Sequence, residues 1–143
     1  MRALILAAIL SAIAWHAAAD PCKAIPDKGP MPAYLHPGGT FSGAVVYVGD
    51  GDSLCVAVSR DTQSPDNWVE VRLGDFYAPE LNAPGGREAK FALERIAMGR
   101  RAWCWAEHRS YDRIVANCSI NGRSIGDLMR AAGIAEGGRG RGG

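Results

Sequence analysis

The chain has 143 residues, a length typical of a single domain. It carries 16 basic and 15 acidic side chains, so its formal net charge at pH 7 is +1. This balance supplies no bulk attraction to a polyanion, which argues against a protein that coats nucleic acid with high affinity and leaves an enzyme open.

The first nineteen residues have the pattern of a secretory signal peptide. Arg2 supplies a positive charge, residues 3–14 are almost wholly apolar, and three alanines at 17–19 precede Asp20. The apolar run is short for a membrane span; a buried N-terminal helix and an uncleaved anchor are the alternatives. We expect cleavage after residue 19, export to the periplasm or the medium, and no stable membrane anchor afterwards. Cleavage also removes Arg2, which leaves a net charge of zero.

All four cysteines lie in the part that would be exported, and an even number in an oxidising compartment predicts two disulfides. Cys104 and Cys118 flank a predicted turn near Tyr111 at equal distances, so they would face each other in a regular hairpin. Cys22 would then pair with Cys55, although four cysteines allow three pairings. Zinc is the alternative, but no C-x-x-C spacing supports it.

Residues 20–40 are rich in Pro and Gly and predict an irregular leader, held mainly by its cysteine. Beyond it, runs of β-favouring residues predict strands over 44–48 and 53–58, joined by a tight turn at 49–52. A third strand is predicted over 68–73, where apolar and polar residues alternate.

The second half begins after a Pro-Gly-Gly break, where apolar residues at helical spacing predict a helix over 87–98. A hairpin with strands at 102–106 and 115–120 follows, and then a short helix over 124–132. The tail at 138–143 consists of Gly and Arg and is predicted to be flexible.

Three strands, a helix, two strands and a second helix predict a mainly β, α+β domain over residues 41–137. The order fits a five-stranded Greek-key barrel of the OB type with two short helices. An open α+β sheet with the same elements is the alternative. Ser124 stands three residues before Asp127, which is the spacing of a capping box, and is the predicted N-cap of the second helix.

Two carboxylates lie on the predicted turn between the first two strands. Asp50 and Asp52 flank Gly51 and could offer oxygens to a hard cation such as Ca²⁺. The Asp-Gly pair is also the commonest signal for a hairpin turn, so the turn by itself does not establish a metal site.

Arginines and a glutamate follow near other turns. Arg72 lies on the polar side of its strand, Glu80 follows a Pro-containing turn, and Tyr111 and Arg113 lie at the hairpin tip. A guanidinium matches phosphate oxygens, and a glutamate can orient a water as general base. Taken singly, each of these residues is also compatible with an ordinary solvated surface.

Together these stretches resemble the thermonuclease (staphylococcal nuclease-like) family. The chain reads D-G-D-S at 50–53, V-R-L-x-x-x-x-A-P-E at 71–80, Y-D-R at 111–113 and G-D-L at 126–128. The resemblance covers roughly residues 41–136. It implies an OB barrel that depends on calcium and cleaves phosphodiester bonds of DNA and RNA.

Carried over by position, the resemblance implies roles for individual residues. Asp52 corresponds to a metal-binding carboxylate, and Ala78 to a residue whose backbone carbonyl binds the metal. Glu80 corresponds to the general base, near the metal-bound water. Arg72 and Arg113 correspond to the two arginines that bind the phosphate.

Two aromatic positions extend the comparison. Tyr111 corresponds to an aromatic residue that lines the nucleotide site. Tyr77 departs from the family pattern, because members typically have a second metal-binding aspartate there. A phenol with a pKa near about 10 is a poor ligand for Ca²⁺, so we expect weakened calcium binding, another divalent metal or no metal. Asp75, two residues upstream, and Asp50 are candidate substitutes.

The sequence therefore predicts an exported nuclease, monomeric, with DNA or RNA as substrate. Two other functions stay open. One is a catalytically impaired OB module that binds nucleotides or single strands through stacked aromatics, for which Trp68, Trp103, Trp105 and Tyr111 are present. Tryptophans in strands are, however, more often core residues. The other is a small structural domain.

Overall fold

The computed structural model describes residues 20–137, so the predicted signal peptide and the Gly/Arg tail lie outside the described residues. Two 3₁₀ turns, η1 (Ala33–Leu35) and η2 (Pro65–Asn67), lie between the larger elements. The strands and helices are, in chain order, β1 (Thr40–Asp50), β2 (Ser53–Ala57), β3 (Trp68–Leu73), α1 (Gly86–Ala97), β4 (Arg101–Ser110), β5 (Arg113–Ile120), β6 (Arg123–Ser124) and α2 (Ile125–Ala131).

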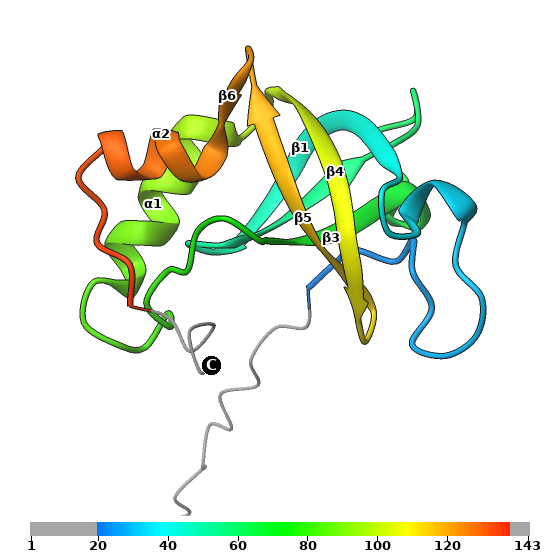
Figure 1. Ribbon diagram of the computed structural model, residues 1–143, viewed down its shortest axis with the longest axis horizontal. Helices are drawn as coiled ribbons and strands as arrows, with labels where there is room; N and C mark the ends of the chain where they lie inside the picture. Colours follow the sequence, from blue (N-terminus) through cyan, green and yellow to red (C-terminus); the bar gives the residue numbers. More distant parts are fainter. Residues whose placement is uncertain (1–19, 138–143) are drawn as a thin grey trace, which may run out of the picture.

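The strands form one closed barrel (Figure 1). Their order is β3-β2-β1-β4-β5-β6, and β3 also pairs with β5 in parallel, with Val71 opposite Ile114. That last pairing closes five strands into an OB-like barrel, while β6 adds only a short ribbon to β5. The predicted fold class is therefore confirmed, and the open sheet is excluded.

The core of the barrel is formed by the inward-facing residues of its alternating strands. Buried and partly exposed residues alternate without interruption along both β3 and β5. On α1, Ala89, Ala92, Leu93 and Ala97 are buried. Both helices lie together on one side of the barrel (Figure 1). The opposite rows of β3 and β5, which are mostly polar, are only partly buried and form part of the outer surface.

The structure extends several predicted elements. The strand predicted at 44–48 is eleven residues long and is bulged between Val45 and Tyr47, which adds the twist that a closed barrel needs. The strand β4 runs to Ser110, and the two-residue β6 was not predicted because so short a segment carries no periodicity. The Ser124 cap is confirmed, since its Oγ accepts a hydrogen bond from the N–H of Asp127 at 2.9 Å.

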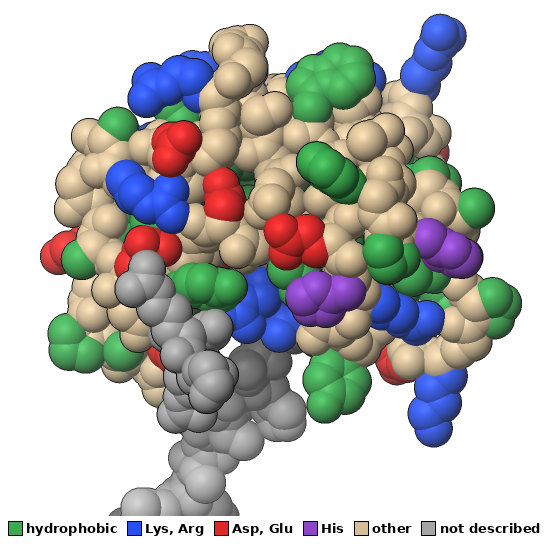
Figure 2. All heavy atoms as spheres, viewed as in Figure 1, with side chains coloured by type: hydrophobic (Ala, Val, Ile, Leu, Met, Phe, Trp, Pro, Cys, Tyr) green, Lys and Arg blue, Asp and Glu red, His purple; other side chains and the backbone are tan. Residues whose placement is uncertain are grey.

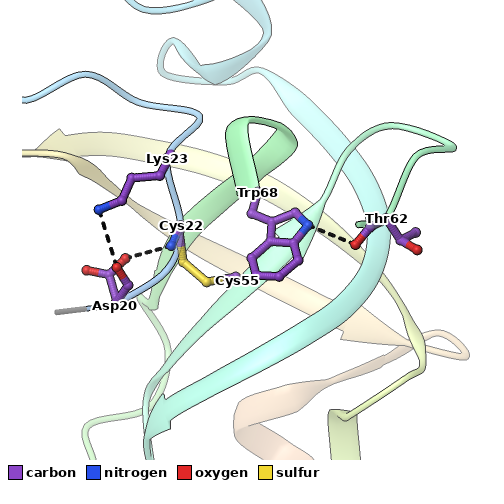
Figure 3. Close-up of a disulfide and its surroundings, with 6 residues drawn as sticks. All are labelled: Asp20, Cys22, Lys23, Cys55, Thr62 and Trp68. Carbon is purple, nitrogen blue, oxygen red and sulfur yellow. Dashed lines mark hydrogen bonds between the residues drawn. A yellow bond between two sulfur atoms is a disulfide. The ribbon is translucent and has the colours of Figure 1, made fainter. Parts of the chain in front are cut away.

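Both predicted disulfides are present, Cys22–Cys55 and Cys104–Cys118, and they indicate an oxidising compartment. The first bond attaches the leader to β2 (Figure 3). The leader is held at further points as well, because the N–H of Ala24 donates to the carbonyl of Trp68 at 3.0 Å and Leu35 is fully buried. Within residues 20–137, no helix has the length and apolar character needed to cross a membrane.

Replacing Cys22 and Cys55 with serine is expected to lower the free energy of unfolding by about 3–4 kcal/mol. The bond spans 33 residues, and closing a loop of that length in the unfolded chain removes a corresponding amount of entropy. Urea denaturation of the two proteins measures the difference. A loss below about 1 kcal/mol would show that the leader is held mainly by its other contacts.

Candidate active site

A buried carboxylate lies where the β1–β2 turn meets the end of β3. Asp52 is 7% exposed, and its carbonyl accepts a hydrogen bond from the N–H of Leu73 at 2.8 Å. Its Oδ2 accepts a hydrogen bond from the N–H of Ala78 at 3.1 Å and lies 3.8 Å from Nη2 of Arg72. Asp52 therefore connects three segments, which are the β1–β2 turn, the end of β3 that carries Arg72, and residues 78–80.

A second carboxylate stands beside Asp52. Asp50 Oδ1 accepts hydrogen bonds from the Ser53 hydroxyl at 2.8 Å and from the N–H of Asp52 at 3.2 Å. Burial, a hydrogen bond with the Asp50 side chain and the Asp50 charge raise the pKa of Asp52 to about 7, against the opposing effects of Arg72 and the Ala78 N–H. A nearby cation or a proton would relieve the repulsion between the two groups.

The two predicted phosphate arginines come from neighbouring strands. Arg72 of β3 is opposite Val115 of β5, so Arg113 lies two residues further along the same outer row. Both arginines are partly exposed. Glu70 precedes Arg72 in the outer row of β3, and the charge of Arg113 acts on its carboxyl group. The parallel β3–β5 pairing thus puts two arginines that are 41 positions apart in the sequence on the same outer surface, offset by two residues in register.

Tyr77 packs against one of these arginines. The Arg72 guanidinium carbon lies 5.7 Å from the centre of the Tyr77 ring. The Tyr77 backbone is fixed by the C-terminal segment, because its N–H donates to Glu136 Oε1 at 3.1 Å and its carbonyl accepts from the N–H of Gly137 at 3.0 Å. The residue that departs from the family pattern therefore holds Arg72 by a cation–π contact.

Glu80 lies on the exposed loop after β3 and borders a cavity of about 840 Å³. Within residues 20–137 it forms no ion pair with Arg72 or Arg113. A Cβ at Gly86 would lie 2.0 Å from the Glu80 carbonyl oxygen, so glycine is required for α1 to begin against this loop. The cavity is lined by Gly49, Asp50, Glu80, Leu81, Asn82, Ala83, Gly85, Arg87, Glu88, Lys90 and Phe91.

Asp75 contacts α2 rather than Asp52. Its Oδ2 accepts a hydrogen bond from the Ser124 hydroxyl at 2.7 Å, and its carbonyl accepts one from Arg130 Nη2. A Cβ at Gly126 would lie 2.7 Å from the same carboxylate oxygen. These contacts fasten the start of α2 to the end of β3, and they give no support to the metal role considered for Asp75.

Tyr111 lies at the tip of the β4–β5 hairpin and is 86% exposed, in left-handed backbone geometry with φ 58°. Its carbonyl accepts a hydrogen bond from Nε of Arg109 at 2.6 Å. Other guanidinium nitrogens of Arg109 donate to the carbonyls of Gly29 and Pro26. Arg109 thereby ties the leader to the hairpin tip, a contact between distant segments that no local pattern could have revealed.

A further group of carboxylates was not predicted from the sequence. Carboxylate oxygens of Asp20, Glu70 and Asp112 lie within 4.8 Å of one another, a spacing that could hold a metal ion. Asp20 also lies near Cys22 and Cys55, but those sulfurs form a disulfide and offer no thiolate. The three acids come from the leader, β3 and the hairpin turn, so only the fold reveals their proximity.

Burial, followed by the charges of Asp20 and Asp112, raises the pKa of Glu70 to about 7, against the opposing charge of Arg113. In the unfolded chain the pKa of Glu70 is near 4.5, so the unfolded state loses the Glu70 proton at lower pH than the folded state does. The free energy of unfolding therefore falls as pH rises from about 4.5 to about 7. We expect Glu70→Gln to remove that fall, a change on the order of 1 kcal/mol once solvent screening is considered. Thermal unfolding at pH 5 and pH 8 measures it, and equal pH dependence in both proteins would contradict the assignment.

Comparison with protein-family models finds no match to this chain, and no curated protein matches it either. The resemblance to thermonucleases therefore rests on the residues quoted above.

Proposed function

We propose that this protein is an exported nuclease that hydrolyses phosphodiester bonds of DNA or RNA. The observation that carries the proposal is the placement of Arg72 and Arg113 on adjoining strands, with the buried Asp52 beside Arg72. Two guanidinium forks on one surface match the oxygens of a phosphodiester. They would stabilise the additional negative charge that these oxygens gain in the transition state.

Glu80 is the proposed general base. Its carboxylate takes a proton from a water molecule, and the water oxygen forms a bond to phosphorus while the bond to the leaving oxygen breaks. The leaving oxygen then gains a proton from solvent. Glu80 borders the same cavity as Asp50, which lies two residues before Asp52 in the chain, so the base stands on the acidic side of the site.

The donor set fits a weakly held divalent cation. Asp50 and Asp52 offer adjacent carboxylates whose repulsion a cation would relieve, whereas Tyr77 offers none. Ca²⁺ takes six to eight oxygens, so water and the Ala78 carbonyl would have to complete its coordination. A bound cation would add positive charge next to the phosphate oxygens. We propose Ca²⁺ as the first candidate, with other divalent ions as alternatives.

The second candidate function is a binding module for single-stranded nucleic acid that does not cleave it. It is favoured by the loss of an acid at Tyr77 and by large exposed aromatic side chains, including Tyr111, Trp103 and Trp105. In both proposals, the predicted signal peptide and the two disulfides favour the periplasm or the medium as the location. We propose a monomer as the working unit.

The test uses the oxidised chain from Asp20 onward, incubated with single-stranded DNA and with RNA. Separate reactions contain Ca²⁺, Mg²⁺, Mn²⁺ or EDTA. We expect cleavage of at least one substrate in the presence of a divalent ion and loss of cleavage in Asp52→Asn. Cleavage that instead depends on Glu70 would place the ion among Asp20, Glu70 and Asp112. Intact substrate in every reaction would leave the binding module as the function.

A further inference from the structure

Two tryptophans stand on the surface of β4, contrary to the expectation that strand tryptophans are core residues. Trp103 is 59% exposed and Trp105 is 61% exposed. They alternate with the buried Ala102, Cys104 and Ala106, so both indoles project from the outer face of the barrel. At a rise of about 3.4 Å per residue, two side chains that are two positions apart stand about 7 Å apart.

Small polar residues surround the indoles. Thr40 and Ser42 of β1 lie opposite Trp105 and Trp103, and a hollow of about 510 Å³ extends over these strands. On the other side, β5 contributes Asn117 and Ser119 to the same hollow. The buried Cys104–Cys118 disulfide joins β4 to β5 on the inner side.

Positive charge borders this surface. The guanidinium carbon of Arg101 lies 5.2 Å from the centre of the Trp103 ring, and its Nη2 donates a hydrogen bond to Ser42 Oγ at 2.8 Å. Arg100 lines a further hollow together with Arg101 and Trp103. On the face that Figure 2 presents, a large hydrophobic side chain at the upper edge lies next to Lys or Arg side chains. A polyanion that also has flat apolar groups would match this combination.

The surface continues toward the candidate active site. Residues 113, 115, 117 and 119 form the outer row of β5, which starts at Arg113 and ends opposite Trp103. The four residue steps from Arg113 to Asn117 span about 13 Å of strand. Glu107 lies along this path, and its Oε1 accepts a hydrogen bond from Asn117 at 2.8 Å. A phosphate chain passing here would be repelled by Glu107.

We propose that Trp103 and Trp105 form a platform on which successive bases of single-stranded DNA or RNA stack. Bases in a duplex are already stacked on one another, so only an unpaired strand offers their faces to the indoles. Arg100 and Arg101 contact the backbone at one end of the platform. The inference that the nucleic acid continues from the platform to Arg113 rests on the proposed nuclease function. The stacking of bases on the two indoles does not depend on that function.

The test measures binding of a fluorescein-labelled, twelve-nucleotide single-stranded DNA by anisotropy, in EDTA so that metal-dependent cleavage is suppressed. We expect the double variant Trp103→Ala, Trp105→Ala to lose at least tenfold in affinity, while Trp103→Phe, Trp105→Phe retains most of it because a ring remains. Met98→Ala, at another exposed apolar position, serves as the matched control and should bind normally. Glu107→Gln is expected to bind more tightly, and circular dichroism verifies the fold of each variant.

Each outcome separates the platform from the nuclease. Unchanged affinity of the alanine double variant, or equal affinity for the twelve-base-pair duplex, would overturn the platform even if the wild-type chain cleaves DNA. Loss of affinity in a chain that cleaves nothing would support the platform and contradict the nuclease. A wild-type chain that binds no single strand but dimerises through these tryptophans would overturn the platform in favour of a protein interface.

Discussion

Replacing Arg72 with alanine is expected to lower the rate of phosphodiester cleavage by a factor of about 10²–10³. The guanidinium is proposed to donate hydrogen bonds to oxygens that gain charge in the transition state, and loss of one such donor typically has an effect of this size. Arg113→Ala should have a similar effect. Rates are measured with substrate in excess, on a single-stranded oligonucleotide with one labelled end.

Two further variants define the origin of this effect. Arg72→Lys keeps the charge but not the planar fork, so its rate should lie between those of the wild type and the alanine variant. Arg95 is an exposed arginine on α1, away from both strands, and Arg95→Ala should cleave at the wild-type rate. Equal losses in Arg72→Ala and Arg95→Ala would show that the arginines act only through overall charge.

Replacing Tyr77 with aspartate is expected to increase the affinity for Ca²⁺ by at least about tenfold. The change places a carboxylate directly before Ala78, whose N–H already contacts Asp52, and the number of charged ligands is a main determinant of calcium affinity. It also removes the ring that holds Arg72, so cleavage need not improve in proportion. Isothermal titration calorimetry measures the affinity directly.

The matched control is Tyr77→Asn, which has nearly the same shape as the aspartate variant but no charge. It should bind Ca²⁺ no better than the wild type. If the aspartate and asparagine variants bind the ion equally, then Tyr77 does not occupy a ligand position, and the metal must be sought elsewhere, with the acids around Glu70 as the next candidates.

The barrel was predictable because its signals are local. Alternation in β3, the Asp-Gly turn before β2 and the helical stripe of α1 each follow from neighbouring residues. The cysteine pairing followed from the hairpin, since Cys104 and Cys118 lie at equal distances from its turn. The closed barrel was inferred from the order of these elements alone, and the parallel β3–β5 pairing that closes it was not predicted.

The details of the site depended on contacts between distant segments. Asp75 lies two residues before Tyr77 and would share its side if the strand continued, but the chain leaves regular strand geometry after Leu73, and the Asp75 carboxylate turns to Ser124. The Tyr77–Arg72 contact joins two residues whose side-chain directions the sequence does not specify. Similarly, strand alternation puts Trp103 and Trp105 on one face, but only the surrounding elements determine that this face is uncovered.

The most direct test of the proposed chemistry compares the purified wild-type chain with Glu80→Gln on one single-stranded oligonucleotide, under single-turnover conditions with Ca²⁺. The amide keeps the shape of the side chain and cannot take a proton from water. We predict that cleavage by the variant is slower by a factor of about 10² or more while its affinity for the oligonucleotide is unchanged. Equal cleavage rates for the two proteins would contradict the assignment of Glu80 as general base and, with it, the proposed mechanism.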